Sequence, residues 1–483
     1  MASKTKAKAL VLPHQRKGTQ FLRQHERAAL FDEQGLGKSK QLIDAISAEV
    51  AAKSIEGAVI ICPNGLKSNW ASEIERFSNL PFAVFGSGKK ARRVAFRSLN
   101  AAFYVINYES VAGELASLRA LLRFKPMALV LDESHRIKTP SAAVTKAILE
   151  LRSTAARRYI LSGTPVANKP EDIWSQMFFL DDGKALGDSF EKFEGKFKVS
   201  GGGYRQIDEL RTEVSKVSLR RLKDHAVKLP PKTFTRISVP MSGRQKITYD
   251  TLRDELHVWV TSLSGEQVAK DAEAVLARLI RLAQIASNPR LIDAAYVDVP
   301  GKFKALDRLL SDLFKKPAQK VIVWSSFVAN IVELKARYAS YSPVVLHGEL
   351  DNKQRDKSVR AFRSDPRVRL LIANPAAARE GLTLTEANVA IYLDRTFNLV
   401  DYLQSQDRIH RISQKAPCQI ILLLAADTID QFIDFSLEQK TRLARYAQLD
   451  TGEVAADDLA LEKPELLKAL LAPSAKQIKS KRH

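Results

Sequence analysis

Several features that mark particular classes of protein are scarce in this chain of 483 residues. Its two cysteines, Cys62 and Cys418, are too few for a disulfide framework or a zinc site, and they suit a reducing compartment. The longest uninterrupted apolar stretch, residues 420–426, is far shorter than the ~20 residues that a transmembrane helix requires. The first ten residues are polar and lysine-rich, unlike a signal peptide. These absences predict a cytoplasmic protein with no membrane partner.

Charge, by contrast, is abundant and one-sided. The chain has 76 Lys and Arg against 54 Asp and Glu, which gives a formal charge of +22 and a pI near 9.8. Because contacts with phosphates release counterions, an excess of this size favours a polyanionic partner such as nucleic acid. A generally solubilising surface charge explains the same excess, so the charge alone leaves both interpretations open.

Short runs rich in Val, Ile and Leu alternate with helical stretches, the pattern of parallel sheets with crossover helices. We predict one series of strands near residues 28–31, 58–62, 103–106, 127–131 and 158–161, and a second near 321–324, 343–346, 368–372, 389–393 and 419–424. Two series indicate an α/β protein with two lobes.

The predicted domains follow from these series: a first lobe over residues 1–182, helical insertions and a linker over 183–300, a second lobe over 301–450, and a basic tail over 451–483. The tail is either a nucleic-acid-binding arm or a solvated end.

A glycine-rich segment predicts a phosphate-binding loop. Gly35-Leu36-Gly37-Lys38-Ser39 follows an apolar strand and precedes a helical run. Glycines let backbone N–H groups turn toward phosphates, and the start of a helix adds partial positive charge. Lys38 is expected to reach the β and γ phosphates and Ser39 to ligate Mg²⁺. Asp32 stands where the strict motif has glycine, so a chance glycine–lysine turn is the alternative.

A pair of carboxylates supports the loop. Asp132 and Glu133 directly follow the apolar run 127–131. Because the carboxyl ends of parallel strands lie at one edge of a sheet, this pair is expected at the same edge as the phosphate loop. We expect Asp132 to hold Mg²⁺ and Glu133 to orient and deprotonate the attacking water. A helix-capping turn is the alternative, but a position downstream of a phosphate loop argues against it. Ser162 and Thr164, after the next strand, are expected to sense the γ phosphate, although a Ser/Thr turn without a role would look the same.

Two arginines in the second lobe complete the predicted site. Arg408 and Arg411 are three residues apart, so on a helix both would face one side. Surface arginines at this spacing are usually solvated or salt-bridged. Their position after a strand of the second lobe favours instead an arginine that stabilises charge during phosphoryl transfer, with Arg411 the better candidate.

Taken together, these motifs resemble those of helicase superfamily two, and within it the DEAD/DEAH-box-related Swi/Snf-type (Snf-like) DNA translocases, over residues 12–439. The matching residues are Leu12-Pro13-His14-Gln15, Phe31 through Ser39, Cys62-Pro63 with Trp70 and Glu73, Asp132 through His135, Leu219 through Lys223, Leu229 through Thr233, Gln245, Tyr249, residues 280–282, Asn288-Pro289, Gly301-Lys302, residues 321–327, His347-Gly348 and residues 404–414.

The resemblance implies two RecA-like lobes, ATP and Mg²⁺ as cofactors, and double-stranded DNA as a partner bound without sequence preference. It implies that Gln15 reads the adenine base, that His135 couples hydrolysis to movement, and that Asp32 belongs to the family's own form of the loop. The segments 219–223 and 229–233 are typical of the Swi/Snf branch rather than of helicases in general.

The chain also departs from the family pattern. Residues 376–384 lack most of the expected glycines, and we expect Arg379, Glu380 and Gly381, together with Gln404, to contact DNA or the first lobe. Ser39 replaces the commoner threonine and keeps the hydroxyl. The compact chain resembles viral and bacterial members of the family. For a viral protein, the expected location is the cytoplasm of the host cell.

The implied function is an ATP-dependent motor that tracks the backbone of double-stranded DNA without obligatory strand separation. Two alternatives stay open: a strand-separating helicase on DNA or RNA, and a clamp that binds nucleotide and DNA without hydrolysis.

Overall fold

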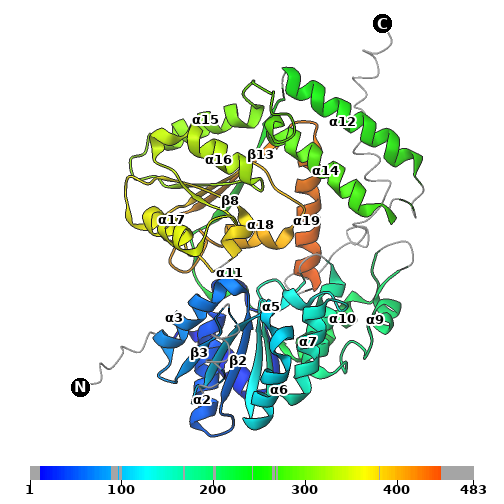
Figure 1. The fold of residues 1–483 in the computed structure, drawn as a ribbon, viewed down its shortest axis with the longest axis vertical. Helices are drawn as coiled ribbons and strands as arrows, with labels where there is room; N and C mark the ends of the chain where they lie inside the picture. The colour runs from blue at the N-terminus through cyan, green and yellow to red at the C-terminus, as the bar shows by residue number, and fades with distance from the viewer. Residues whose placement is uncertain are drawn as a thin grey trace. The chain divides into compact units, whose positions relative to one another are not determined.

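A computed structural model describes residues 11–86, 88, 96, 100–166, 169–199, 203–241, 243–263, 267, 270–379 and 381–447 (Figure 1). Internal contacts group the described chain into two units. The first contains the residues up to Lys228 and those from Arg442 onward, and the second contains Leu229 to Thr441. The intermediate region predicted over 183–300 is therefore shared between the two units, while the predicted 451–483 tail lies outside the described residues.

The first unit is built on a seven-stranded parallel sheet in the order β3-β4-β2-β5-β6-β1-β7. Its strands are β1 (Arg27–Leu30), β2 (Gly57–Cys62), β3 (Phe82–Val84), β4 (Phe103–Asn107), β5 (Met127–Asp132), β6 (Arg157–Leu161) and β7 (Ser218–Leu219). Its helices are α1 (Pro13–Gln24), α2 (Lys38–Ala51), α3 (Lys67–Phe77), α5 (Tyr108–Val111), α6 (Leu115–Phe124), α7 (Ala143–Leu151), α8 (Trp174–Asp181), α9 (Phe190–Phe197), α10 (Ile207–Lys216) and α11 (Lys223–Ala226).

The second unit has a six-stranded parallel sheet in the order β10-β11-β9-β12-β13-β8. Its strands are β8 (Lys232–Val239), β9 (Val321–Trp324), β10 (Val344–Leu346), β11 (Leu370–Ala373), β12 (Val389–Tyr392) and β13 (Cys418–Ala425). Its helices are α12 (Gly243–Ser262), α14 (Ala272–Ser287), α15 (Gly301–Leu313), α16 (Val328–Arg337), α17 (Asn352–Ser364), α18 (Leu399–Gln406) and α19 (Ile429–Ala447), which continues into the first unit.

Strands buried on both faces explain the continuous apolar runs in the sequence. In β9, Val321 and Val323 pack on one face with α15 and α16, whereas Ile322 and Trp324 pack on the other with α17. Successive side chains of a strand point to opposite faces, so a central strand between two helical layers has to be apolar throughout. The α/β class and both predicted series of strands are confirmed.

Three strands were missed by the sequence prediction. β3 and β7 are too short to show a pattern, and β8 reads as a half-polar run, Lys-Thr-Phe-Thr-Arg-Ile-Ser-Val, in which only Val239 is buried. β8 pairs on one side only, with β13, and an edge strand keeps polar side chains. Residues 183–300 are mostly helical, as predicted, but they also contain β7 and β8.

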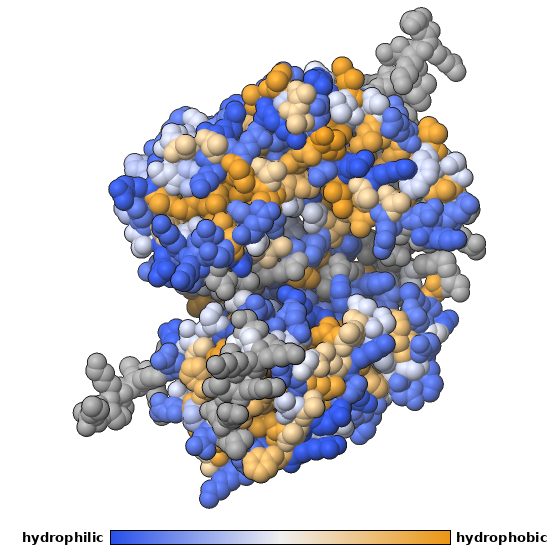
Figure 2. All heavy atoms as spheres, in the orientation of Figure 1, coloured by the Kyte–Doolittle hydropathy of each residue, from blue (hydrophilic) through white to orange (hydrophobic). Residues whose placement is uncertain are grey.

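Among the described residues, no helix is both long and apolar enough to cross a bilayer. On the face drawn in Figure 2, hydrophobic residues are interspersed with hydrophilic ones.

Candidate nucleotide-binding site

The predicted phosphate loop connects β1 to α2 in the first unit. Gly35 and Gly37 have φ of 90° and 78°, in the left-handed region where only glycine is unstrained, and Gly37 caps α2. Lys38 is the first residue of the helix, and its Nζ donates a hydrogen bond to the carbonyl of Asp32, 2.8 Å away. Burial lowers the pKa of Lys38, while the carboxylates of Glu133 and Asp32 oppose that shift. The loop therefore presents a buried ammonium group at the start of a helix, followed by the Ser39 hydroxyl.

Asp132 and Glu133 lie at the carboxyl end of β5. The indole Nε1 of Trp70 donates to Asp132 Oδ2 at 2.8 Å, and the backbone N–H of Glu133 donates to Asp132 Oδ1 at 3.0 Å. Burial, and next the negative charge of Glu133, raise the pKa of Asp132 to about 7. Two adjacent carboxylates, one buried and one half-buried, thus share the neighbourhood of one ammonium group, an arrangement that favours an added cation.

The Ser162–Thr164 turn belongs to the same site. A Cβ added to Gly163 would lie 2.6 Å from Gln34 Cγ and 3.5 Å from Lys38 Nζ, so this turn packs directly against the phosphate loop. Gln34 in turn donates to Glu133 Oε1 at 3.2 Å. The backbone N–H of Thr164 donates to Ser162 Oγ at 3.1 Å, and Thr164 Oγ1 is buried without a hydrogen-bond partner. The structure therefore brings the three predicted motifs of the first lobe together at one edge of the sheet.

Two further predicted residues adjoin this cluster. His135 Nδ1 is 3.4 Å from Glu133 Oε2. Gln15 lies against the loop, because a Cβ added to Gly37 would be 2.6 Å from its Nε2, while its Oε1 accepts from Leu12 N at 3.2 Å. The roles of His135 in coupling and of Gln15 in reading the base stay predictions.

The sequence prediction missed Gln176 of α8. Its side chain is fully buried; Oε1 accepts from Ser134 Oγ at 2.6 Å and Nε2 donates to the carbonyl of Pro165 at 2.7 Å. Gln176 therefore bridges the carboxylate segment and the Ser162–Pro165 turn. Nothing in the sequence distinguishes it from any other polar residue of a helix.

The segment that follows β7 also belongs to the site. Arg220 Nη1 donates to the carbonyls of Phe31, at 2.6 Å, and Gly163, at 3.0 Å, and Glu33 accepts from Lys223 N at 2.8 Å. Residues 219–223, identified from the sequence only as a branch signature, thus hold the start of the phosphate loop.

In the second unit the two candidate arginines do not lie on a helix, so that part of the prediction was wrong, although both side chains donate to the segment 381–383. α18 ends at Gln406, and Arg408 and Arg411 lie in the turns beyond it. Arg408 is buried and donates to the carbonyls of Gln404, at 2.8 Å, and Leu382, at 3.2 Å. Arg411 is half-buried and donates to Thr383 Oγ1 at 2.7 Å. Bonds to Leu382 and Thr383 thus hold the two side chains, and the catalytic roles stay predictions.

The segment with missing glycines packs on these arginines. Gly381 has φ of 67°, and its carbonyl accepts from Arg411 Nη1 at 3.2 Å. Arg379 ends a 3₁₀ helix (Pro375–Arg379), its side chain lies outside the described part of the chain, and so does all of Glu380. Gln404 is buried. A contact of these residues with DNA or with the first lobe stays a prediction.

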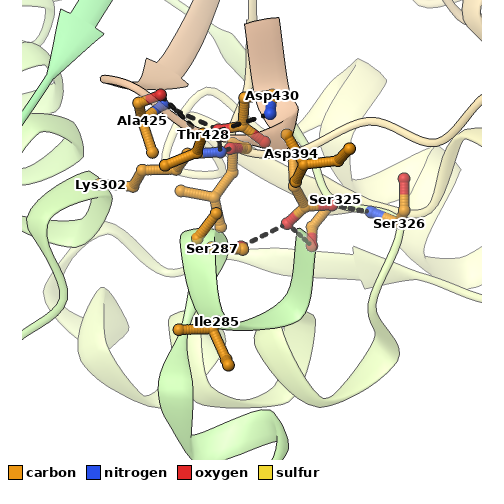
Figure 3. Close-up of polar contacts among 12 residues, drawn as sticks. Ile285, Ser287, Lys302, Ser325, Ser326, Asp394, Ala425, Thr428 and Asp430 are labelled. Atoms are coloured by element: carbon orange, nitrogen blue, oxygen red, sulfur yellow. Dashed lines mark hydrogen bonds and ion pairs between the residues drawn. The ribbon is translucent and has the colours of Figure 1, made fainter. Parts of the chain in front are cut away.

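Lys302 and Asp394 make buried polar contacts in the second unit (Figure 3). Lys302 Nζ is 2.5 Å from Asp430 Oδ2 and also donates to the carbonyl of Leu393 at 2.9 Å. Asp394 accepts from the Ser287 and Ser325 hydroxyls, both at 2.8 Å, and from Ser326 N at 2.6 Å. Lys302, one of the residues that match the family pattern, therefore makes its contacts within the core of the second unit.

Comparisons with known proteins agree with this arrangement. The SNF2-related domain matches residues 14–291 and the helicase conserved C-terminal domain matches residues 301–413. The Chromodomain-helicase-DNA-binding protein 1-like of Danio rerio is 28% identical over 487 residues, which cover 94% of this chain and 46% of the relative. The ISWI chromatin-remodeling complex ATPase CHR11 of Arabidopsis thaliana is 28% identical over 422 residues, covering 83% of this chain and 39% of that protein.

The chain thus spans less than half the length of these two relatives. Among solved structures, the Sulfolobus solfataricus SWI2/SNF2 ATPase core in complex with dsDNA is 26% identical with a TM-score of 0.44, covering 93% of this chain and 95% of that one. Because the SNF2-related domain alone matches more than half of its residues, the chain belongs to the SNF2-related family.

Proposed function

We propose that this protein is an ATP-hydrolysing translocase on double-stranded DNA. The observation that carries the proposal is the meeting of Lys38, Glu133 and Gly163 at the carboxyl edge of the first sheet. This edge is where parallel α/β sheets bind phosphorylated ligands, and a phosphate loop beside a carboxylate pair is the constellation of ATP hydrolysis.

Each side chain then has a role. Lys38 binds the β and γ phosphates, and Glu133, held by Gln34, orients the attacking water and takes its proton. The Ser162–Thr164 turn, packed on the loop, senses loss of the γ phosphate. Arg411 supplies positive charge to the transferring phosphoryl group when the lobes close, and Arg408 stabilises the turn that carries Arg411.

Magnesium suits the donor set. Asp132 is a buried carboxylate whose pKa is raised to about 7 by burial and by the adjacent charge of Glu133, and the Ser39 hydroxyl follows the lysine of the loop. Asp132 and Ser39 would hold the ion, which would neutralise phosphate charge when bound. Asp132 is in turn oriented by Trp70.

Double-stranded DNA is the proposed track because of the charge and the relatives. The excess of +22 suits phosphate contacts, and relatives are named as DNA-binding proteins and as chromatin-remodeling ATPases. Contacts to the phosphate backbone carry no sequence information, so binding is expected to be nonspecific and to weaken steeply with salt.

An ATPase titration tests this function. Hydrolysis by the whole chain is measured with double-stranded DNA, single-stranded DNA and RNA at fixed salt. We expect double-stranded DNA to stimulate turnover most, and Lys38→Ala and Glu133→Gln to abolish the stimulation. Strongest stimulation by RNA or single strands would favour a strand-separating helicase, and binding without any turnover would favour a clamp.

A further inference from the structure

Arg221 lies at the centre of a polar cluster beneath the phosphate loop. Its Nε donates to Asp32 Oδ1 at 2.8 Å and its Nη2 donates to both Asp32 Oδ2 and Gln41 Oε1, the latter at 2.7 Å. Gln41 Nε2 donates in turn to Asp32 Oδ2 at 3.1 Å and to the carbonyl of Leu36 at 3.2 Å. The bidentate ion pair with Arg221 neutralises the Asp32 carboxylate, which is fully buried and would be costly to leave unpaired.

The same guanidinium group reaches the start of α1. Arg221 Nη1 donates to the carbonyl of His14, whose ring Nε2 is 3.0 Å from the carbonyl of Leu36 in the loop. Gln15, which the family resemblance predicts to read the base, is the next residue and lies against Gly37. One side chain from the segment after β7 thus joins the base-reading segment, the phosphate loop and helix α2.

The polar cluster around Arg221 packs closely against α1. A Cβ added to Gly18 of α1 would lie 1.7 Å from Gln41 Oε1 and 2.7 Å from Arg221 Nη2. Any side chain at residue 18 would therefore displace the cluster without removing a charge. The side-chain ends of Arg221 and Gln41 therefore pack against α1 at Gly18.

We propose that Arg221 is a positioning residue that sets nucleotide affinity and selectivity for adenine by fixing Gln15 relative to the phosphate loop. This inference rests on the proposed function. Lys38 donates to the carbonyl of Asp32 and Glu133 accepts from Gln34, so neither of these two contacts uses the Arg221 side chain. Loss of Arg221 is therefore expected to act on KM and base selectivity more than on kcat, because a misplacement of ~1 Å at a binding group costs tenfold or more.

The test compares the binding of fluorescent N-methylanthraniloyl-ATP and -GTP, and the KM and kcat of DNA-stimulated hydrolysis, in the whole chain. Arg221→Met is expected to weaken ATP binding and lower the ATP/GTP preference, each by roughly tenfold, with kcat within about threefold of the original. Gly18→Ala is expected to shift the preference in the same direction while leaving every charge in place.

Stability is separated from positioning by two variants. The double variant Asp32→Leu/Arg221→Met removes both buried charges and is expected to recover stability relative to Arg221→Met, but not the ATP/GTP preference. The control is Arg157→Met in the same unit, which removes the 2.9 Å ion pair between Arg157 and Glu49. The Arg157 side chain is 15% exposed and that of Arg221 is 16% exposed, so the two variants remove ion pairs of similar burial. Arg157 lies in β6 near its amino-terminal end, so this variant is expected to keep the preference.

The outcomes are distinct. Failure of the original protein to bind the ATP analogue would overturn the proposed function itself. Normal binding by the original, with an ATP/GTP preference within about twofold in both Arg221→Met and Gly18→Ala, would overturn the role of Arg221 alone. An equal loss of preference in Arg157→Met would do the same, since it would show a general effect of instability. If Arg221→Met does not fold, Gly18→Ala and the double variant decide.

Discussion

The ammonium group of Lys302 lies in the core of the second unit, with its side chain 1% exposed and 2.5 Å from Asp430, whose side chain is 6% exposed. Lys302→Met keeps most of the volume and removes the charge. It leaves Asp430 buried with a backbone N–H as its remaining donor, and it withdraws the positive charge that opposes the burial-raised pKa of Asp394. Breaking a buried pair in this way costs ~3–5 kcal/mol.

Hydrogen exchange followed by mass spectrometry gives this cost for each unit separately. Peptides covering β12 and β13 are expected to lose ~3–5 kcal/mol of protection in Lys302→Met, whereas peptides covering β5 in the first unit keep theirs. The double variant Lys302→Met/Asp430→Leu should regain most of the loss, because two apolar side chains can replace a buried pair.

A matched exposed pair serves as the control. Lys315 and Asp312 are 2.7 Å apart but are 74% and 70% exposed, so Lys315→Met is expected to change protection by less than ~0.5 kcal/mol. A loss below ~1 kcal/mol in Lys302→Met, or an equal loss in Lys315→Met, would refute the reasoning that burial makes the Lys302 pair costly to break.

Three further outcomes follow from the first unit. Gln176→Leu should lower the free energy of unfolding by ~2–4 kcal/mol, because the Ser134 hydroxyl and the Pro165 carbonyl lose their partner. Hydrogen exchange in β5 and β6 measures this loss, and no measurable loss would contradict the bridging role of Gln176. Gly163→Ala should slow DNA-stimulated hydrolysis at least ~tenfold, because its Cβ meets Gln34, and unchanged turnover would contradict the packing of this turn. The hydrogen bond from Arg158 holds the pKa of Asp182 well below its ordinary value, so the stability that Asp182 contributes is complete above about pH 4 and falls as the pH drops further. In urea unfolding at pH 5 and pH 3, Asp182→Asn should therefore reduce the loss of stability between the two pH values. An unchanged loss of stability would contradict this effect of Asp182.

The central strands and the phosphate loop were predictable because one physical cause dominates each. A strand such as β5 or β9 is buried on both faces, so it is apolar throughout and visible without knowledge of its neighbours. The loop needs left-handed glycines at Gly35 and Gly37, and this need is written in the sequence itself.

The remainder depends on contacts between distant residues. β8 is half-polar because it pairs on one side only, which no local pattern states. At the end of α18, Arg408 donates to the carbonyl of Gln404 in the last turn and Gln414 donates to the carbonyl of Ile409 beyond it, with no glycine or proline to mark the end. Asp32 departs from the strict loop pattern because Arg221, almost two hundred residues later, requires a carboxylate there.

Displacement of a third strand from a DNA triplex tests the central claim most directly. The protein is loaded on a duplex that carries the third strand downstream, with ATP, and release of the third strand is followed beside separation of the duplex. We expect ATP-dependent release without duplex separation, and loss of release in Glu133→Gln, which keeps the size of the side chain but not the base. Duplex separation, or release that persists in Glu133→Gln, would contradict a translocase driven by hydrolysis at this site.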